Sequence, residues 1–109
     1  MKTLSKFVLM IVALIGLSNT TSFATNYYVD PSSTSTTANG SLAYPWKTIA
    51  QVNSGTTLLN PGDSVFFKRG QSYSGRLTIS RSGSATAPIV YTNYGTGNLP
   101  EFNNAITDI

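Results

Sequence analysis

The sequence predicts an all-β fold that contains one short helix. From residue 61 onward, short runs rich in β-branched and aromatic residues alternate with turns that contain glycine or proline. Four of these runs start near residues 64, 76, 89 and 101, at nearly equal steps. Only residues 44–53 carry apolar side chains at helical spacing. Such regular spacing indicates a repeating β architecture.

The first 24 residues have the three regions of a secretory signal peptide. Lys2 and Lys6 form the positive region, and residues 7–17 are almost entirely apolar. Ser22 and Ala24 place small side chains before a cleavage site after Ala24. The apolar run is too short to cross a bilayer, which takes roughly 20 residues. We therefore expect a secreted, extracellular protein with no membrane segment after cleavage.

The remaining segment, residues 25–109, is nearly neutral and lacks cysteine and histidine. Two of the seven basic residues belong to the signal, so five basic residues face four acidic ones. This balance gives no reason to expect a nucleic acid or a membrane as partner. A secreted domain of this size usually needs disulfides or a larger structure to complete its core. We therefore expect residues 25–109 to be the first part of a longer, truncated β domain.

The first elements expected in the mature chain are a strand, a loop and the helix. Residues 26–31 have the composition of a strand, and the Ser/Thr-rich residues 32–41 predict an exposed loop. Residues 44–53 predict a helix with four side chains on one face: Trp46, Ile49, Ala50 and Asn53. A helix of about two turns is not stable alone. Trp46 is therefore expected to anchor the core and not to stack on a sugar.

Four more strands are expected at residues 64–68, 76–80, 89–93 and 101–103. Alternate strands start 25 residues apart, which fits a parallel β-helix that climbs one rung in that distance. To within one residue, Val65 would then lie under Ile89, and Leu77 under Phe102. An antiparallel sandwich also has regular spacing, but no two-residue Asn-Gly or Asp-Gly hairpin loop joins these strands. The spacing favours the parallel β-helix and leaves the sandwich open.

The mature chain carries a succession of short motifs: Tyr27-Tyr28-Val29, Pro45-Trp46-Lys47-Thr48-Ile49, Leu59-Asn60-Pro61-Gly62-Asp63-Ser64-Val65, Tyr73-Ser74-Gly75, Leu77-Thr78-Ile79, Ser82-Gly83 and Pro88-Ile89-Val90-Tyr91. This succession resembles the N-terminal portion of pectate-lyase-like right-handed parallel β-helix proteins and covers nearly all of residues 25–109. The resemblance implies that the short helix plugs the open N-terminal end of the solenoid. It also implies that the turn at Pro61-Gly62-Asp63 begins the first coil. It is silent on activity, because the same opening precedes several kinds of enzyme.

No catalytic residue is assigned within this chain. The resemblance implies either elimination by a Lys or Arg base with carboxylates that often hold calcium, or hydrolysis by clustered aspartates. The mature chain has four acidic residues, none within four positions of another: Asp30, Asp63, Glu101 and Asp108. Asp63 follows Pro-Gly and is expected to fix its own turn. We therefore expect an inactive segment with no cofactor or metal of its own, whose longer form could hold calcium.

Two groups of side chains are candidates for contact with a glycan. A basic strip could form from Lys68, Arg69, Arg76 and Arg81, although scattered surface charges explain these residues better. A carbohydrate platform could form from five tyrosines, although strand tyrosines are more often half-buried packing: Tyr27, Tyr28, Tyr73, Tyr91 and Tyr94. The lack of cysteine and histidine excludes thiol and transition-metal catalysis within these residues.

The sequence thus predicts the N-terminal cap and first coils of a secreted polysaccharide-degrading β-helix protein, either a lyase or a glycoside hydrolase. The expected partner is an extracellular polysaccharide, and the expected oligomeric state is a monomer. A protein of another class stays open, namely a non-catalytic carbohydrate-binding or adhesive β module. The DNA that follows the Ile109 codon distinguishes the module from the enzyme segment. A stop codon there favours the module, and sequence that encodes further coils favours the enzyme segment.

Overall fold

The computed structural model describes residues 23–103. Its elements are, in chain order, β1 (Asn26–Val29), α2 (Ile49–Gly55), the 3-10 helix η1 (Thr56–Leu58), β2 (Ser64–Lys68), β3 (Ser72–Tyr73), β4 (Val90–Tyr94) and β5 (Glu101–Phe102). Most of the expected signal peptide and the last six residues lie outside the described part. Within that part, none of the helices has the length and apolar character needed to cross a membrane.

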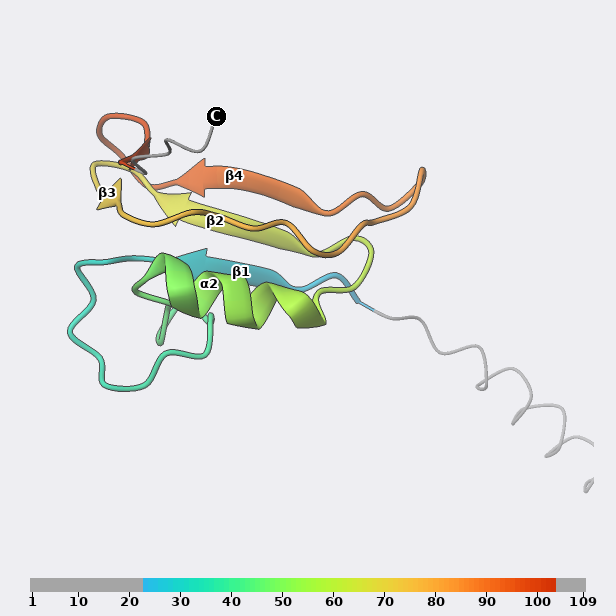
Figure 1. The fold of residues 1–109 in the computed structure, drawn as a ribbon, viewed down its shortest axis with the longest axis horizontal. Helices are drawn as coiled ribbons and strands as arrows, with labels where there is room; N and C mark the ends of the chain where they lie inside the picture. Colours follow the sequence, from blue (N-terminus) through green and yellow to red (C-terminus); the bar gives the residue numbers. More distant parts are fainter. Residues whose placement is uncertain (1–22, 104–109) are drawn as a thin grey trace, which may run out of the picture.

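The strands form two small parallel sheets. In the first sheet the order is β1-β2-β4, and in the second β3 pairs with β5. Figure 1 shows β1, β2 and β4 one above another, so successive strands of this sheet stack in chain order. Every ladder among the described strands is parallel. An antiparallel sandwich, which pairs neighbours in sequence, does not have this arrangement.

The pairing differs in register from the sequence expectation. Val65 pairs with Tyr91 and not with Ile89, and Phe102 pairs with Tyr73 and not with Leu77. The expected strand at 76–80 is a loop. The side chain of Asn53 explains this loop, because its amide donates to the Arg76 carbonyl at 2.8 Å and its oxygen accepts from the Thr78 N–H at 2.8 Å. These backbone groups are bound to a helix side chain and not to a neighbouring strand.

The helix starts later than predicted, at Ile49. Thr48 is its N-cap, with an extended backbone and a hydroxyl that accepts from the Gln51 N–H at 3.1 Å. Trp46 lies before the helix and forms a parallel bridge with Val29. Ile49 is buried as expected, but Ala50 is exposed and Val52 takes the buried position. The expected helix face was therefore wrong at Trp46 and Ala50, because the chain at Trp46 bonds to β1.

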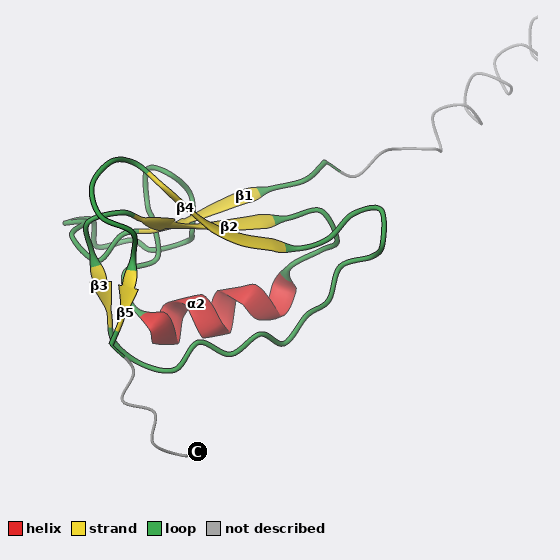
Figure 2. Cartoon of the chain, turned by 90° about the horizontal axis from the view of Figure 1, so that it is seen from above, coloured by secondary structure: helices red, strands yellow, loops and turns green. Residues whose placement is uncertain are grey.

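The core lies between the three-stranded sheet and α2. It consists of Val29, Trp46, Ile49, Val52, Leu59, Val65, Phe67 and Tyr73. Figure 2 shows α2 inside an outline formed by the sheet, the β3–β5 pair and the segment that follows β3. In Figure 1 the helix lies at the level of β1, the lowest strand of the stack. The helix therefore covers one end of the space enclosed by the chain.

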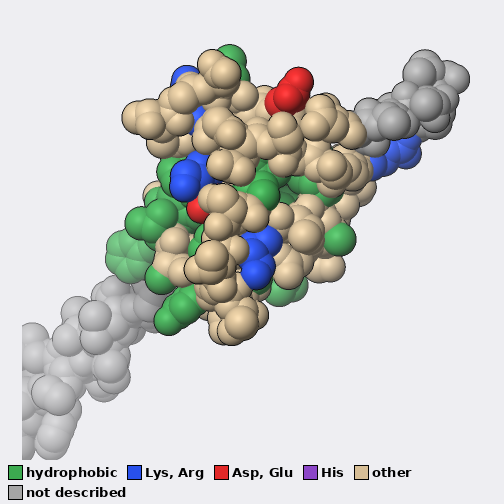
Figure 3. Space-filling model, turned by 90° about the vertical axis from the view of Figure 1, so that its left-hand side faces the viewer, with side chains coloured by type: hydrophobic (Ala, Val, Ile, Leu, Met, Phe, Trp, Pro, Cys, Tyr) green, Lys and Arg blue, Asp and Glu red, His purple; other side chains and the backbone are tan. Residues whose placement is uncertain are grey.

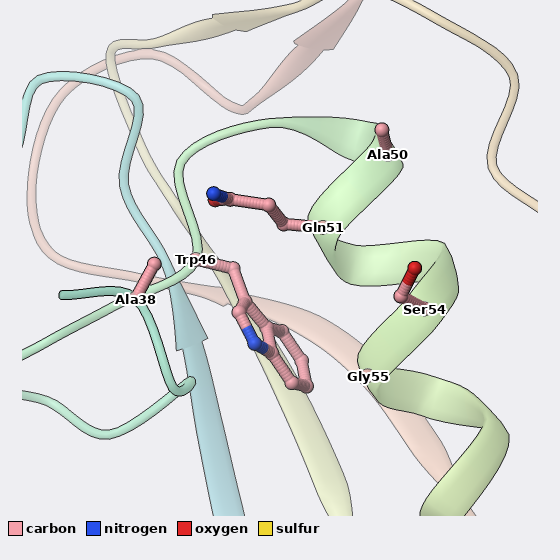
Figure 4. Close-up of a pocket in the computed structure, with 6 residues that line it drawn as sticks. All are labelled: Ala38, Trp46, Ala50, Gln51, Ser54 and Gly55. Carbon is pink, nitrogen blue, oxygen red and sulfur yellow. The ribbon is translucent and has the colours of Figure 1, made fainter.

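Trp46 is confirmed as a core residue, since only 5% of its surface is exposed. Its indole stacks on Tyr27 with ring centroids 5.2 Å apart and planes 4° apart. Two glycines leave room for the ring. A Cβ placed on Gly40 would lie 2.9 Å from indole atoms, and one on Gly55 would lie 2.0 Å from Cζ2. Figure 4 shows the indole directed at the helix, beside Gly55.

Candidate functional site

The face of the three-stranded sheet that points away from the core carries the candidate site. Along β2, Val65 and Phe67 are buried, so Phe66 and Lys68 lie on the opposite face. The register then places Tyr28, Phe66 and Thr92 in one row across this face. The next row holds Lys68 and its partner Tyr94, with Asp30 directly after the last residue of β1.

We call five of these residues the outer-face cluster: Tyr28, Asp30, Phe66, Lys68 and Tyr94. Its three aromatic rings contact one another. The rings of Tyr28 and Phe66 are stacked, with centroids 5.4 Å apart and planes 18° apart. Tyr94 meets Tyr28 edge to face at 5.2 Å, with planes 80° apart. Both arrangements are favourable for aromatic pairs. The three rings are half-buried and take no part in the core.

The charged part of the outer-face cluster is an ion pair. Lys68 Nζ lies 3.2 Å from Asp30 Oδ2, and Asp30 Oδ1 accepts from the Ser32 N–H at 2.9 Å and from the Ser32 hydroxyl. Partial burial alone would raise the pKa of the Asp30 carboxyl, but the Ser32 and Lys68 hydrogen bonds outweigh it and lower the pKa. The carboxylate is therefore ionised at neutral pH. Figure 3 shows such a pair of opposite charges with hydrophobic side chains beside it.

Tyr94 closes the row beside this ion pair. Burial raises the pKa of its phenol, and the negative charge of Asp30 and the neighbouring Tyr28 raise it further. Tyr94 is thus a neutral hydroxyl at physiological pH. The phenol groups of Tyr28 and Tyr94 can each donate and accept a hydrogen bond. The cluster consequently combines two phenol hydroxyls and an ion pair with aromatic rings.

The five tyrosines do not form a single platform. Tyr27 stacks on Trp46, and Tyr73 is buried between Phe67 and Phe102. The Tyr73 hydroxyl donates to the Lys68 carbonyl at 2.9 Å. Tyr91 lies in register with the buried Val65 and so faces inward. Only Tyr28 and Tyr94 face outward, since the alternation of side chains along each strand separates the set.

Phe66, the third aromatic residue of the outer-face cluster, was not singled out from the sequence. Its position between Val65 and Phe67 is the signal that could have identified it, because successive side chains of a strand point to opposite faces.

The basic residues are held by different elements and do not act as a strip. Lys68 pairs with Asp30. Arg69 donates to the Asn93 side chain at 2.9 Å and to the Gly97 carbonyl at 3.0 Å. Arg81 donates to the Thr57 carbonyl at 2.8 Å. These contacts bind Lys68, Arg69 and Arg81 to separate parts of the fold, which favours scattered charges over a basic strip.

The carboxylates in the described part are likewise separate. Asp63 is buried and accepts from the Thr25 and Asn60 N–H groups, both at 2.9 Å, which confirms its role in its own turn. Glu101 accepts from the Ser72 hydroxyl at 3.3 Å. Asp108 lies outside the described residues. Between residues 23 and 103 no three His, Cys, Asp or Glu side chains gather as a metal site would require.

Among the hollows in the described part of the chain, two lie at opposite ends of the stack. One of about 410 Å³ is lined by six residues at the helix end, shown in Figure 4: Ala38, Trp46, Ala50, Gln51, Ser54 and Gly55. The other, of about 340 Å³, lies beside β4 and β5 and includes Phe67, Tyr91 and Phe102. The Tyr91 hydroxyl is buried beside the side chain of Thr56. Neither hollow contains a pair of carboxylates.

Comparison with known proteins supplies the chemical context. No protein-family model matches the chain. The lacto-N-biosidase of Bifidobacterium longum subsp. longum is 35% identical over 83 residues, covering 70% of this chain. The chain is related to a segment of a glycoside hydrolase. It spans only 5% of that relative's length.

Solved structures give the same relationship. The native crystal structure of GH136 lacto-N-biosidase from Eubacterium ramulus matches with a TM-score of 0.53 and 29% sequence identity. The match covers 67% of this chain and 12% of that one. A selenomethionine derivative of the same enzyme matches equally well, over 66% of this chain. Most of each relative therefore has no counterpart in this chain.

Proposed function

We propose that this chain forms the N-terminal cap and first coils of a right-handed parallel β-helix in a secreted glycoside hydrolase. The catalytic residues then lie beyond residue 109. The observation that carries the proposal is the parallel stacking of β1, β2 and β4 in chain order, in a segment related to lacto-N-biosidases. This stacking supports a solenoid whose coils follow one another along the sequence.

Two further features support the architecture. β-Strand crossovers between parallel strands of one sheet are almost always right-handed, which favours that hand for the connections β1–β2 and β2–β4. The helix α2 contributes the buried residues Ile49 and Val52 at the level of β1. A solenoid needs such an end cap, because its first coil otherwise exposes apolar side chains to water. In this proposal Trp46 and α2 serve as that cap.

The relatives favour hydrolysis over elimination, since those compared are glycoside hydrolases by name. Hydrolysis of a glycosidic bond generally needs two carboxyl groups on either side of the bond. Asp30, Asp63 and Glu101 share no hydrogen-bond partner and are bound to separate elements. The proposed role of this segment is therefore to fold and close the solenoid, while the acid and base come from later coils.

The decisive experiment is to express the complete secreted protein and assay it for lacto-N-biosidase activity and for cleavage of a panel of other glycans. We expect hydrolysis by the complete protein and none by residues 25–109 alone. Aspartate substitutions in later coils should abolish activity without changing the stability of the cap. Cleavage by residues 25–109 alone, or a gene that ends at the Ile109 codon, would refute the proposal.

A second candidate is a non-catalytic secreted carbohydrate-binding module. The outer-face cluster favours it, because aromatic rings beside polar groups lie on the sheet without any paired carboxylates. The two candidates differ in their unfolding. A cap fragment exposes its last rung and should unfold weakly and without cooperativity when residues 25–109 are produced alone. A complete module should give one sharp transition as a monomer.

A further inference from the structure

We propose that the outer-face cluster binds a neutral oligosaccharide. The class of ligand rests on the proposed function, while the location rests on the geometry of the sheet. Tyr28, Phe66 and Tyr94 supply the apolar contact, and Lys68, held by Asp30, supplies hydrogen bonds to hydroxyl groups. No carboxylate pair lies among these residues, so the site holds a glycan without cleaving it.

The aromatic part of the cluster is available because the fold does not use it. The buried core is complete without Tyr28, Phe66 and Tyr94, and the residues that pack against its margin do not include them. Their rings instead contact one another across three strands. A sugar ring has one apolar face of C–H groups, and a surface formed by aromatic side chains can cover it and exclude water from it.

Hydrogen-bonding capacity remains beside these rings. A lysine ammonium has three donors, and Lys68 uses one of them on Asp30. The side chain of Lys68 is 38% exposed, so its other donors can reach a ligand. Tyr28 and Tyr94 each add a phenol hydroxyl, which can both donate and accept a hydrogen bond. Ligand pockets for polar molecules commonly combine apolar walls with a few such groups.

The charges of the cluster select a neutral ligand. Lys68 and Asp30 are paired at 3.2 Å, so their charges cancel at the surface. An anionic glycan would have to compete with Asp30 for the ammonium, and it would meet no second free cation in the cluster. A hydroxyl group of a neutral sugar can accept from Lys68 without breaking the pair, because the ammonium keeps further donors. Asp30 is only 13% exposed and already accepts from Ser32 and Lys68, so its role is to hold and neutralise the ammonium.

The test measures glycan binding to the complete protein by isothermal titration calorimetry, with lacto-N-biose and cellohexaose as neutral probes and hexagalacturonate as the anionic probe. We expect binding of at least one neutral probe and weaker binding of the anionic one. Tyr94→Ala should weaken neutral binding about tenfold, because a sugar-facing ring is lost. Tyr94→Phe, which keeps the ring, should lose no more than a few-fold.

Tyr44→Ala is the matched control, since Tyr44 is 46% exposed and lies in the loop before Trp46, outside the cluster. It should leave binding unchanged. Equal binding by wild type and Tyr94→Ala, or no binding of either neutral probe, would overturn the inference. The hydrolase assay is scored separately on the same variants. Hydrolysis with unaltered binding in Tyr94→Ala refutes only this site, whereas binding without hydrolysis refutes only the proposed enzyme.

Discussion

Replacing Gly55 with alanine tests how the helix is fastened to the first strand. Gly55 is the last residue of α2 and has ordinary helical backbone angles, φ −70° and ψ −35°. Helix propensity alone would therefore favour alanine, by at most about 1 kcal/mol. The new methyl group, however, would lie 2.0 Å from Cζ2 and 2.6 Å from Cε2 of Trp46. Non-bonded carbon atoms do not approach this closely, so either the indole or the helix must move.

The indole has little freedom to move. Tyr27 stacks on it at 5.2 Å, and a Cβ on Gly40 would also come within 2.9 Å of it. The backbone of Trp46 is bound to β1 on both sides, by its N–H to the Tyr28 carbonyl and by its carbonyl to the Asp30 N–H. Overpacking of a rigid core costs about 1–3 kcal/mol. Since the ring is held on several sides, we expect a net loss of about 2 kcal/mol after the gain in propensity.

Native-state hydrogen exchange of α2 measures this loss locally. The Val52 N–H donates to the Thr48 carbonyl within the first turn, so its exchange rate reports on opening of the helix. Exchange should accelerate about thirtyfold in Gly55→Ala. Ser54→Ala is the control, because Ser54 is exposed and its bond to Thr57 uses only its backbone carbonyl. Unchanged or slower exchange in Gly55→Ala would show that Trp46 does not fix the helix.

Three further outcomes are expected. Asp63→Asn should lose about 1–3 kcal/mol of unfolding free energy in urea denaturation, because an amide can accept only one of the two buried N–H groups now bound by Asp63; an unchanged midpoint would contradict this. The pKa of Asp30 is lower folded than its ordinary value of 3.8, so its contribution to stability is present above that value and disappears as the pH falls through the folded pKa. Acid unfolding of wild type and Asp30→Asn should therefore converge only below about pH 4, and identical curves throughout would refute the ion pair's role. Mass spectrometry of the secreted protein should find Thr25 at the N-terminus, and retention of residues 1–24 would disprove the signal peptide.

Local patterns predicted several elements correctly. The strand at 64–68 was recognised from its β-branched and aromatic residues between two turns, and the structure has the same bounds. The polar and apolar alternation at 76–80 was misleading, since those residues form a loop. The loop at 32–41 and the core position of Trp46 were also confirmed. These features depend on burial and turn chemistry, which act over a few neighbouring residues. Register was wrong, because the pairing of Val65 with Tyr91 depends on loop lengths and side-chain contacts that no local pattern contains.

The candidate site could not be predicted for the same reason, because local patterns do not contain the pairing of strands. Composition identified the tyrosines as a group, but only the pairing of β1, β2 and β4 separates the inward rings from the outward ones. Phe66 became relevant only when its ring was found against Tyr28. The contact between Asp30 and Lys68 joins residues 38 positions apart, and nothing in their spacing indicates it.

The amino-acid sequence alone was sufficient to predict a β-rich chain and a buried tryptophan, while the export signal stays a prediction. Those properties follow from composition and short-range periodicity, because the hydropathy of a side chain and the backbone preference of a residue depend only on that residue and its near neighbours. Only the tertiary structure decided which strands pair, where the helix begins and which aromatic rings face outward. These depend on contacts between distant residues, such as Asn53 with residues 76–78 and Trp46 with β1, whose energies arise only once the chain is folded.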